Sequence, residues 1–97
     1  MYRRDLPEQM TESANDNISR HLGRIFRKAR RRKSLSQNSL SEAANINNSY
    51  YCSIERGTVN LTVRKFISIC GGLEVQPEDV MRELRCFLEG KEDYHDD

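Results

Sequence analysis

The sequence predicts an all-α fold, a compact bundle of five helices. Apolar residues recur at three- and four-residue steps along five stretches of the chain, the period of a helix with one buried face. Helix start and stop signals separate these stretches, and no segment alternates apolar and polar residues as a strand would. A length of 97 residues with 36% hydrophobic content fits one domain with a modest core.

The first predicted helix begins at residue 18, after a segment without a periodic pattern. Its inward face is formed by Ile18, Leu22, Ile25 and Ala29, and Phe26 widens it. Asn17 is the predicted N-cap, and Lys33-Ser34 ends the helix. Residues 1–17 are therefore expected to form a flexible N-terminal arm, with at most one loose turn.

Short polar residues mark the ends of the second and third helices. Ser36 caps the second helix, and Asn45 ends it because asparagine tolerates the left-handed conformation of a helix C-terminus. Asn47 caps the third helix and Gly57 closes it.

The fourth and fifth helices complete the predicted core. Thr62 or Asn60 begins the fourth, and Gly71-Gly72 weakens its end. The fifth helix has Pro77 at its first position, where proline is favoured, and it stops near Gly90, because glycine is favoured just past a helix end.

Charge is strongly segregated along the chain although the net charge is only +1. Residues 20–33 carry eight lysines and arginines and no acid, whereas residues 89–97 sum to −4. The basic run favours a polyanionic partner, and its alternatives are a solvated helix face or a disordered arm. We expect a folded domain over residues 18–88 and an acidic, disordered, solubilising tail over residues 89–97.

Several classes of protein are excluded by what the sequence lacks. No apolar run approaches the ~18–20 residues that span a membrane. Three widely spaced cysteines indicate free thiols in a reducing cytoplasm, not a disulfide framework or a metal site. Neither His21 nor His95 has a neighbouring nucleophile or carboxylate pair for acid–base or metal chemistry. We therefore expect a cytoplasmic protein that is not an enzyme and uses no metal, cofactor or small-molecule ligand.

One constellation of residues carries a family resemblance. It comprises Gln37, Leu40, Ser41, Asn45, Ile46, Tyr51, Ile54, Glu55 and Gly57, together with Leu22-Gly23 and Asn60-Leu61-Thr62. Over residues 18–84 this pattern resembles the helix-turn-helix DNA-binding domains of the Xre/Cro/lambda-repressor type. Leu35-Ser36-Gln37 and Ile54-Glu55-Arg56-Gly57 are its most specific parts. The short chain and Asn60-Leu61-Thr62 are also similar to the controller proteins of restriction–modification systems.

The third helix is the expected recognition helix, because a helix fits the major groove and short polar side chains can bind base edges. The predicted base contacts are Asn47, Asn48, Ser49, Cys52 and Ser53. For Asn47 the alternative is a helix cap alone. For Cys52 we also consider a redox-sensing thiol near the helix N-terminus, where the thiolate would be favoured.

The resemblance implies further roles outside the recognition helix. The predicted phosphate contacts are Gln37, Tyr50, Arg56, Asn60 and Thr62. Tyr50 could instead cover thymine methyl groups or shield the core, and Gln37 could also buttress the recognition helix. Arg30 and Glu55 match a buried salt bridge that joins the first and third helices of many relatives.

The chain departs from the family pattern at four positions. Asn45 stands where glycine is usual, Ser41 where alanine is common, and Leu61 where proline is frequent. Tyr51 replaces a core isoleucine or valine, which predicts local repacking or a hydroxyl that reaches the surface.

These observations predict a homodimeric, sequence-specific double-stranded DNA-binding protein that regulates transcription, as a repressor or activator, from a roughly palindromic operator. One recognition helix contacts few base pairs, so two are expected. The predicted dimer interface on the fifth helix consists of Met81, Leu84, Phe87 and Leu88, unless they all pack internally. The alternative function is a protein-interaction module, such as an antitoxin or anti-repressor partner.

Overall fold

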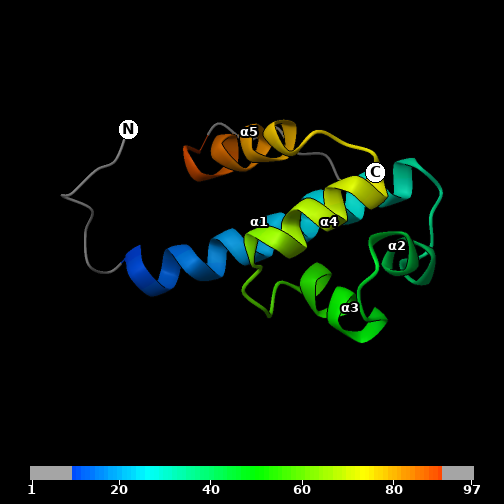
Figure 1. The fold of residues 1–97 in the computed structure, drawn as a ribbon. Coiled ribbons are helices and arrows are strands. Elements are labelled where there is room, and N and C mark those ends of the chain that lie inside the picture. The colour runs from blue at the N-terminus through cyan, green and yellow to red at the C-terminus, as the bar shows by residue number, and fades with distance from the viewer. Residues whose placement is uncertain (1–9, 91–97) are drawn as a thin grey trace.

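The computed structural model describes residues 10–90 of the chain, which form five helices and the connections between them (Figure 1). The helices are α1 (Met10–Arg32), α2 (Gln37–Ala44), α3 (Asn48–Arg56), α4 (Val63–Leu73) and α5 (Pro77–Leu88). No strand occurs between residues 10 and 90, and the predicted all-α, five-helix fold is confirmed. Within the same range, no helix is both long enough and apolar enough to cross a membrane.

The predicted caps fix the ends of the short helices. Each N-cap side chain accepts a hydrogen bond from the backbone N–H three residues on: Ser36 at 2.9 Å, Asn47 at 3.0 Å and Thr62 at 3.1 Å. Asn45 and Gly57 end α2 and α3 in the left-handed conformation, with φ of 57° and 76°. The fourth helix therefore starts after Thr62, and the alternative start at Asn60 is wrong.

The start of the first helix is a correction to the sequence prediction. Helix α1 begins at Met10, so residues 10–17 are helical and are not part of an arm. Asn17 lies inside the helix and is not its N-cap; its Oδ1 accepts a hydrogen bond from Arg20 at 2.8 Å. Residues 10–17 contain no proline or glycine, and a helix formed over residues 18–32 propagates into such a segment at little cost. Residues 1–9 of the expected arm lie outside the described residues.

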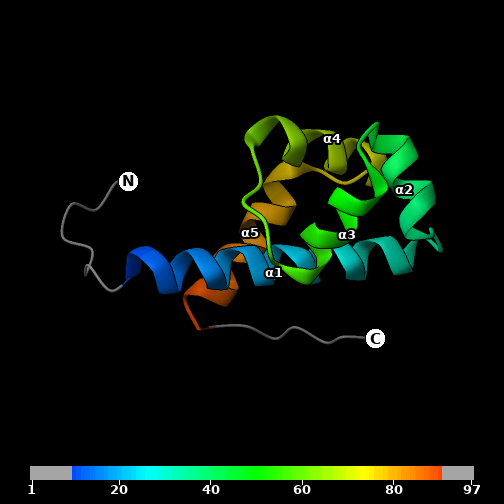
Figure 2. The same cartoon turned by 90° about the horizontal axis from the view of Figure 1, so that it is seen from below.

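Helix α1 lies along one side of the bundle, with α3 and α5 packed against it and α2 and α4 beyond them (Figure 2). Contacts between α2 and α4 and between α1 and α3 are the most extensive. The buried apolar residues come from all five helices: Leu22, Ile25, Phe26, Leu40, Ala44, Tyr51, Ile54, Phe66, Ile69, Cys70, Leu73, Val80, Leu84 and Phe87. Packing of this single core holds α2 and α3 in place against α1.

Two glycines allow helices to approach closely. A Cβ on Gly23 of α1 would lie 2.5 Å from the Ile54 carbonyl oxygen and 2.6 Å from that of Glu55, so α1 and α3 meet backbone to backbone. A Cβ on Gly72 of α4 would lie 2.9 Å from Leu40 Cδ1 and 3.2 Å from the Ala44 nitrogen. Helix α4 runs through Gly72 to Leu73, so this glycine serves the α2–α4 contact.

Candidate nucleic-acid interface

The turn between α2 and α3 brings the two helices together through small and polar side chains. Asn45 adopts the left-handed conformation, and the Ile46 N–H donates back to the Ser41 carbonyl at 2.9 Å. The Ser41 side chain is buried, and its hydroxyl donates to the Asn38 carbonyl at 2.8 Å and lies 3.4 Å from Asn48 Oδ1. The departure from alanine at Ser41 thus adds a polar link between α2 and α3 without separating them.

The N-terminal flank of α3 faces outward. Asn47, Asn48 and Ser49 are all exposed. Asn47 Oδ1 is engaged in capping the helix, which confirms its structural role and leaves its predicted base contact a prediction. Asn48 is joined to Ser41 through Oδ1, so this amide is held at the α2 side of the flank. The flank therefore offers amide and hydroxyl groups on a capped, rigid helix end.

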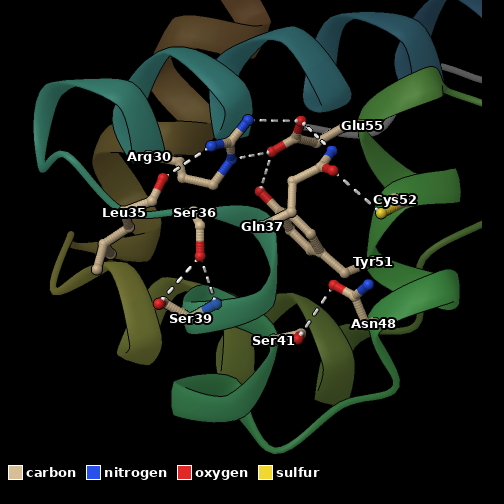
Figure 3. A network of polar contacts seen from close by, with 10 residues as sticks. All are labelled: Arg30, Leu35, Ser36, Gln37, Ser39, Ser41, Asn48, Tyr51, Cys52 and Glu55. Carbon is tan, nitrogen blue, oxygen red and sulfur yellow. Dashed lines mark hydrogen bonds and ion pairs between the residues drawn. The ribbon is translucent and has the colours of Figure 1, made fainter.

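A buried ion pair joins α3 to α1 (Figure 3). Arg30 Nε donates to Glu55 Oε2 at 2.6 Å and Nη2 to Oε1 at 3.1 Å, so the pair is bidentate. The side chains are 13% and 4% exposed, respectively. Arg30 Nη1 also donates to the Leu35 carbonyl at 2.8 Å, which fixes the α1–α2 connection. The structure thus brings together the two residues that the resemblance pairs.

Two more side chains saturate the Glu55 carboxylate. Tyr51 donates its hydroxyl to Oε2 at 2.5 Å, and Gln37 donates its amide to Oε1 at 3.0 Å. With the two Arg30 bonds, all four acceptor positions of a carboxylate are filled. Tyr51 is fully buried, so its hydroxyl does not reach the surface. The hydroxyl instead donates its hydrogen bond to Glu55 inside the protein.

The electrostatics of this network stabilise its charged form. Burial acts to raise the pKa of the Glu55 carboxyl, but hydrogen bonds from Arg30, Tyr51 and Gln37 outweigh it and lower the pKa below the ordinary value. The bond to Glu55 raises the pKa of Arg30, against its burial. Burial and the bond to Glu55 raise the pKa of Tyr51, so its hydroxyl stays a donor.

The first residue of α2 also contacts the recognition helix. Gln37 Nε2 donates to Glu55, and Gln37 Oε1 accepts from the Cys52 thiol at 3.2 Å (Figure 3). Gln37 is half-buried and buttresses α3; its predicted phosphate contact stays a prediction. Cys52 is half-buried, and its predicted base contact stays a prediction. Cys52 follows Asn48 by one turn, so both lie on the flank of α3 that faces α2.

The remaining predicted contacts gather at the outer side of α3 and the start of α4. Ser53 is half-buried, donates to the Ser49 carbonyl at 3.2 Å and accepts from Arg56 at 3.0 Å. Arg56 is exposed, and so are Asn60 and Thr62 in and after the connection to α4.

A basic group that was not predicted from the sequence lies beside Tyr50. Lys65 Nζ lies 5.4 Å from the centroid of the Tyr50 ring, and Tyr50 is half-buried. Arg64 precedes it and is exposed. The signal was the pair Arg64-Lys65, two and three residues after the Thr62 cap and in the first turn of α4. These two cations add positive charge next to the α3–α4 connection.

Helix α5 divides the four residues predicted for a dimer interface. Leu84 and Phe87 are 6% and 9% exposed and belong to the core, so their placement on the surface is wrong. The Phe87 ring stacks on His21 of α1, with centroids 4.5 Å apart. Met81 and Leu88 are 50% and 48% exposed. They are seven residues apart and therefore share one exposed side of α5.

Known proteins share this architecture. The Helix-turn-helix family model HTH_3 matches residues 26–80, and no curated protein matches the chain. The restriction-modification controller protein C.AhdI from Aeromonas hydrophila is 26% identical, with a TM-score of 0.63 over 64% of this chain and 94% of that one. The controller protein C.Esp1396I, solved as a tetramer with its natural 35 base-pair operator, is 28% identical, with a TM-score of 0.66 over 70% and 90%.

A third solved structure shows the fold alone. The clp gene regulator ClgR from Corynebacterium glutamicum is 24% identical, with a TM-score of 0.70 over 76% of this chain and 79% of that one.

The family model covers more than half of the chain, and the capped α2–turn–α3 unit lies within the matched residues. The chain therefore belongs to the helix-turn-helix family of the Xre type.

Proposed function

We propose that this protein binds double-stranded DNA sequence-specifically as a homodimer and regulates transcription from a roughly palindromic operator. The observation that carries the proposal is the exposed N-terminal flank of α3, with Asn47, Asn48 and Ser49, on a helix tied to α1 by the buried Glu55 network. Base readout requires donors and acceptors held in a fixed geometry at the surface, and this flank meets that requirement.

Base contacts are assigned to side chains that have both exposure and suitable chemistry. An asparagine amide can form two hydrogen bonds with adenine N6 and N7, and a serine hydroxyl can serve several bases. Asn48 and Ser49 are the primary candidates, with Asn47 and Ser53 at the edges of the same surface. Cys52 is not assigned a base contact, because its thiol is directed to Gln37.

Phosphate contacts are assigned to groups that border this flank on two sides. Arg56, Asn60 and Thr62 border it towards α4, where Lys65 lies over Tyr50. Gln37 borders it at the N-terminus of α2; one of its two amide N–H groups bonds Glu55, and the second supplies the donor for a phosphate.

Dimerisation is proposed through the exposed side of α5. Met81 and Leu88 form an apolar strip on this side, and both are about half exposed in the single chain. The operator complex of C.Esp1396I is a complex of a tetramer of that protein, which supports a multimeric assembly here. In a symmetric dimer two α3 helices would contact half-sites one helical turn, about 34–36 Å, apart.

Selection of bound duplexes from random DNA tests the proposal. We expect enriched sequences to be inverted repeats, with half-sites separated by about one turn of DNA or a multiple of it. The double variant N48A/S49A, whose exposed positions leave the core intact, should enrich a different or degenerate sequence. Enrichment without sequence preference would contradict specific readout. Failure to bind any duplex at low salt, by a chain that still binds other proteins, would favour the protein-interaction alternative.

A further inference from the structure

Two polar contacts join α2 to α3 beside the exposed flank (Figure 3). Gln37 accepts a hydrogen bond from Cys52 at 3.2 Å, and Ser41 lies 3.4 Å from Asn48. The two residues on each helix are four apart, so the contacts are separated by one helical turn. In each contact, a side chain proposed to bind DNA meets one on the other helix that is buried or half-buried.

The Gln37 amide is held at both of its polar atoms. Its Nε2 donates to Glu55 Oε1 at 3.0 Å, and its Oε1 accepts from the Cys52 thiol. An amide carries its donors and its acceptor on one planar group, so these two bonds fix the plane and the direction in which it points. The reverse orientation would place Gln37 Oε1 against a carboxylate, which also only accepts. The observed orientation is therefore the one that the chemistry of both partners requires.

The partner on the Glu55 side is itself immobile. The Glu55 side chain is 4% exposed, and its carboxylate accepts further hydrogen bonds from Arg30 and Tyr51. The position of Glu55 Oε1 is therefore set by the core. Among the residues that the structure describes, the second N–H of Gln37 Nε2 has no acceptor, and Gln37 remains partly exposed.

The Cys52 thiol supplies the second point at which this amide is held. With the bond to Glu55 alone, the amide could turn about that single bond and carry its second N–H with it. The thiol bond to Oε1 prevents this rotation. A thiol is a weak donor, so its loss removes a constraint on Gln37 and leaves the buried ion pair of α3 intact.

We propose that Cys52 is a positioning residue for the phosphate contact of Gln37. It holds the Gln37 amide so that the second N–H of Nε2 stays directed to the phosphate, and it makes no contact with DNA itself. The phosphate contact rests on the proposed function, whereas the hold on the amide is independent of DNA.

The hold on Gln37 is tested without DNA by NMR of side-chain amides in the full chain. The Gln37 signals are identified by their loss in Gln37→Ala. In Cys52→Ala, the separation between the two amide-proton shifts of Gln37 should shrink towards that of an exposed glutamine. Cys52→Ser keeps a donor and should preserve the separation, and so should the control Cys86→Ala, which changes a half-buried cysteine on α5. Gln37 signals in Cys52→Ala equal to those of the wild type would overturn the proposal.

The effect on the phosphate contact is measured with the selected operator and with a random-sequence duplex. Cys52→Ala should weaken binding to both by about two- to tenfold, the range expected for one hydrogen bond, because a phosphate contact carries no sequence information. The slope of log K against log salt should not change, since the neutral Gln37 side chain releases no counterion. Cys52→Ser should recover most of the affinity.

A double-mutant cycle separates positioning from a direct role. If Cys52 acts through Gln37, Cys52→Ala should have no further effect on DNA binding in a chain that already carries Gln37→Ala. Urea unfolding of each variant establishes that it is folded under the binding conditions. An equal loss from Cys52→Ala with and without Gln37 would overturn the proposal, and so would a changed base preference in Cys52→Ala, which would assign Cys52 to a base.

The two experiments distinguish failure of this inference from failure of the proposed function. Absence of binding to any duplex by the wild type, at every salt concentration, would contradict the proposed function. The NMR comparison of Cys52→Ala with Cys52→Ser would still decide whether the thiol holds the Gln37 amide.

Discussion

The Tyr51 hydroxyl donates a hydrogen bond to Glu55 Oε2, one helical turn along α3, at 2.5 Å. The same oxygen accepts Arg30 Nε at 2.6 Å, so Tyr51 takes part in the ion pair that joins α3 to α1. Tyr51 is fully buried and the Glu55 side chain is only 4% exposed, so water cannot replace either bond. The orientation of the recognition helix therefore depends on a residue that fills the core and completes a buried charge network.

Replacing Tyr51 with phenylalanine is expected to destabilise the fold. Tyr51→Phe keeps the ring and leaves the buried Glu55 carboxylate one hydrogen bond short, which costs about 1.5–3 kcal/mol for a bond to a charged group. Urea unfolding measures the difference. Tyr50→Phe, a half-buried control on the same helix, should unfold within about 0.5 kcal/mol of the wild type. Equal stability of all three proteins would refute the role of Tyr51.

Stability should depend on pH through Glu55. The pKa of this carboxyl is lowered in the folded protein, so its contribution is present above the ordinary value of 4.5 and is lost as pH falls through the lower, folded pKa. Glu55→Gln should lower the free energy of unfolding at neutral pH by about 3–5 kcal/mol, because Arg30 loses its buried partner. Below pH 4.5, the free energy of unfolding of Glu55→Gln should also fall less steeply with falling pH than that of the wild type. Parallel acid profiles for the two proteins would contradict this assignment.

Two adjacent glycines should respond in opposite ways to alanine. Gly71 is exposed in α4 with open space where a Cβ would lie, so Gly71→Ala should stabilise the protein by about 0.5–1 kcal/mol. Gly72→Ala should destabilise it, because the Cβ would press on Leu40 and the backbone of Ala44. Thermal unfolding of both variants decides the matter. A shift of the same sign in both would contradict the close packing of α4 on α2.

Arg56 should contribute to affinity without contributing to specificity. Arg56→Gln is expected to weaken binding about equally for all sequences and to reduce the salt slope by about 0.9 per lost phosphate contact. The control Arg82→Gln on α5 should leave the slope unchanged, since Arg82 is paired with Asp79 away from α3. An altered sequence preference in Arg56→Gln would instead assign Arg56 to a base.

The sequence predicted best those features that depend on local chemistry. Ser36, Asn47 and Gly57 lie at their predicted helix ends because capping is decided within a few residues. The predicted start of α1 was wrong because apolar periodicity reports burial, and residues 10–16 carry no apolar period that would mark a helix. Local signals therefore located α2 and α3, and with them the turn on which the site depends.

Features that depend on the distance between helices could not be predicted in the same way. The bond from Cys52 to Gln37 and the need for Gly72 arise only once α2 has been placed against α3 and α4. Likewise, α5 has more apolar residues than the core buries. The sequence could not show that Phe87 is buried while Leu88 is exposed.

The central claim is that the exposed flank of α3 recognises bases, and Asn48→Ala on the selected operator tests it most directly. We predict a loss of about 1–3 kcal/mol in operator binding, relaxed preference at one base pair in each half-site, and an unchanged salt slope. Affinities for the operator and for a full set of single-base variants, measured at one salt concentration, give this result. Operator affinity and base preference both equal to those of the wild type, in a folded Asn48→Ala protein, would contradict the account.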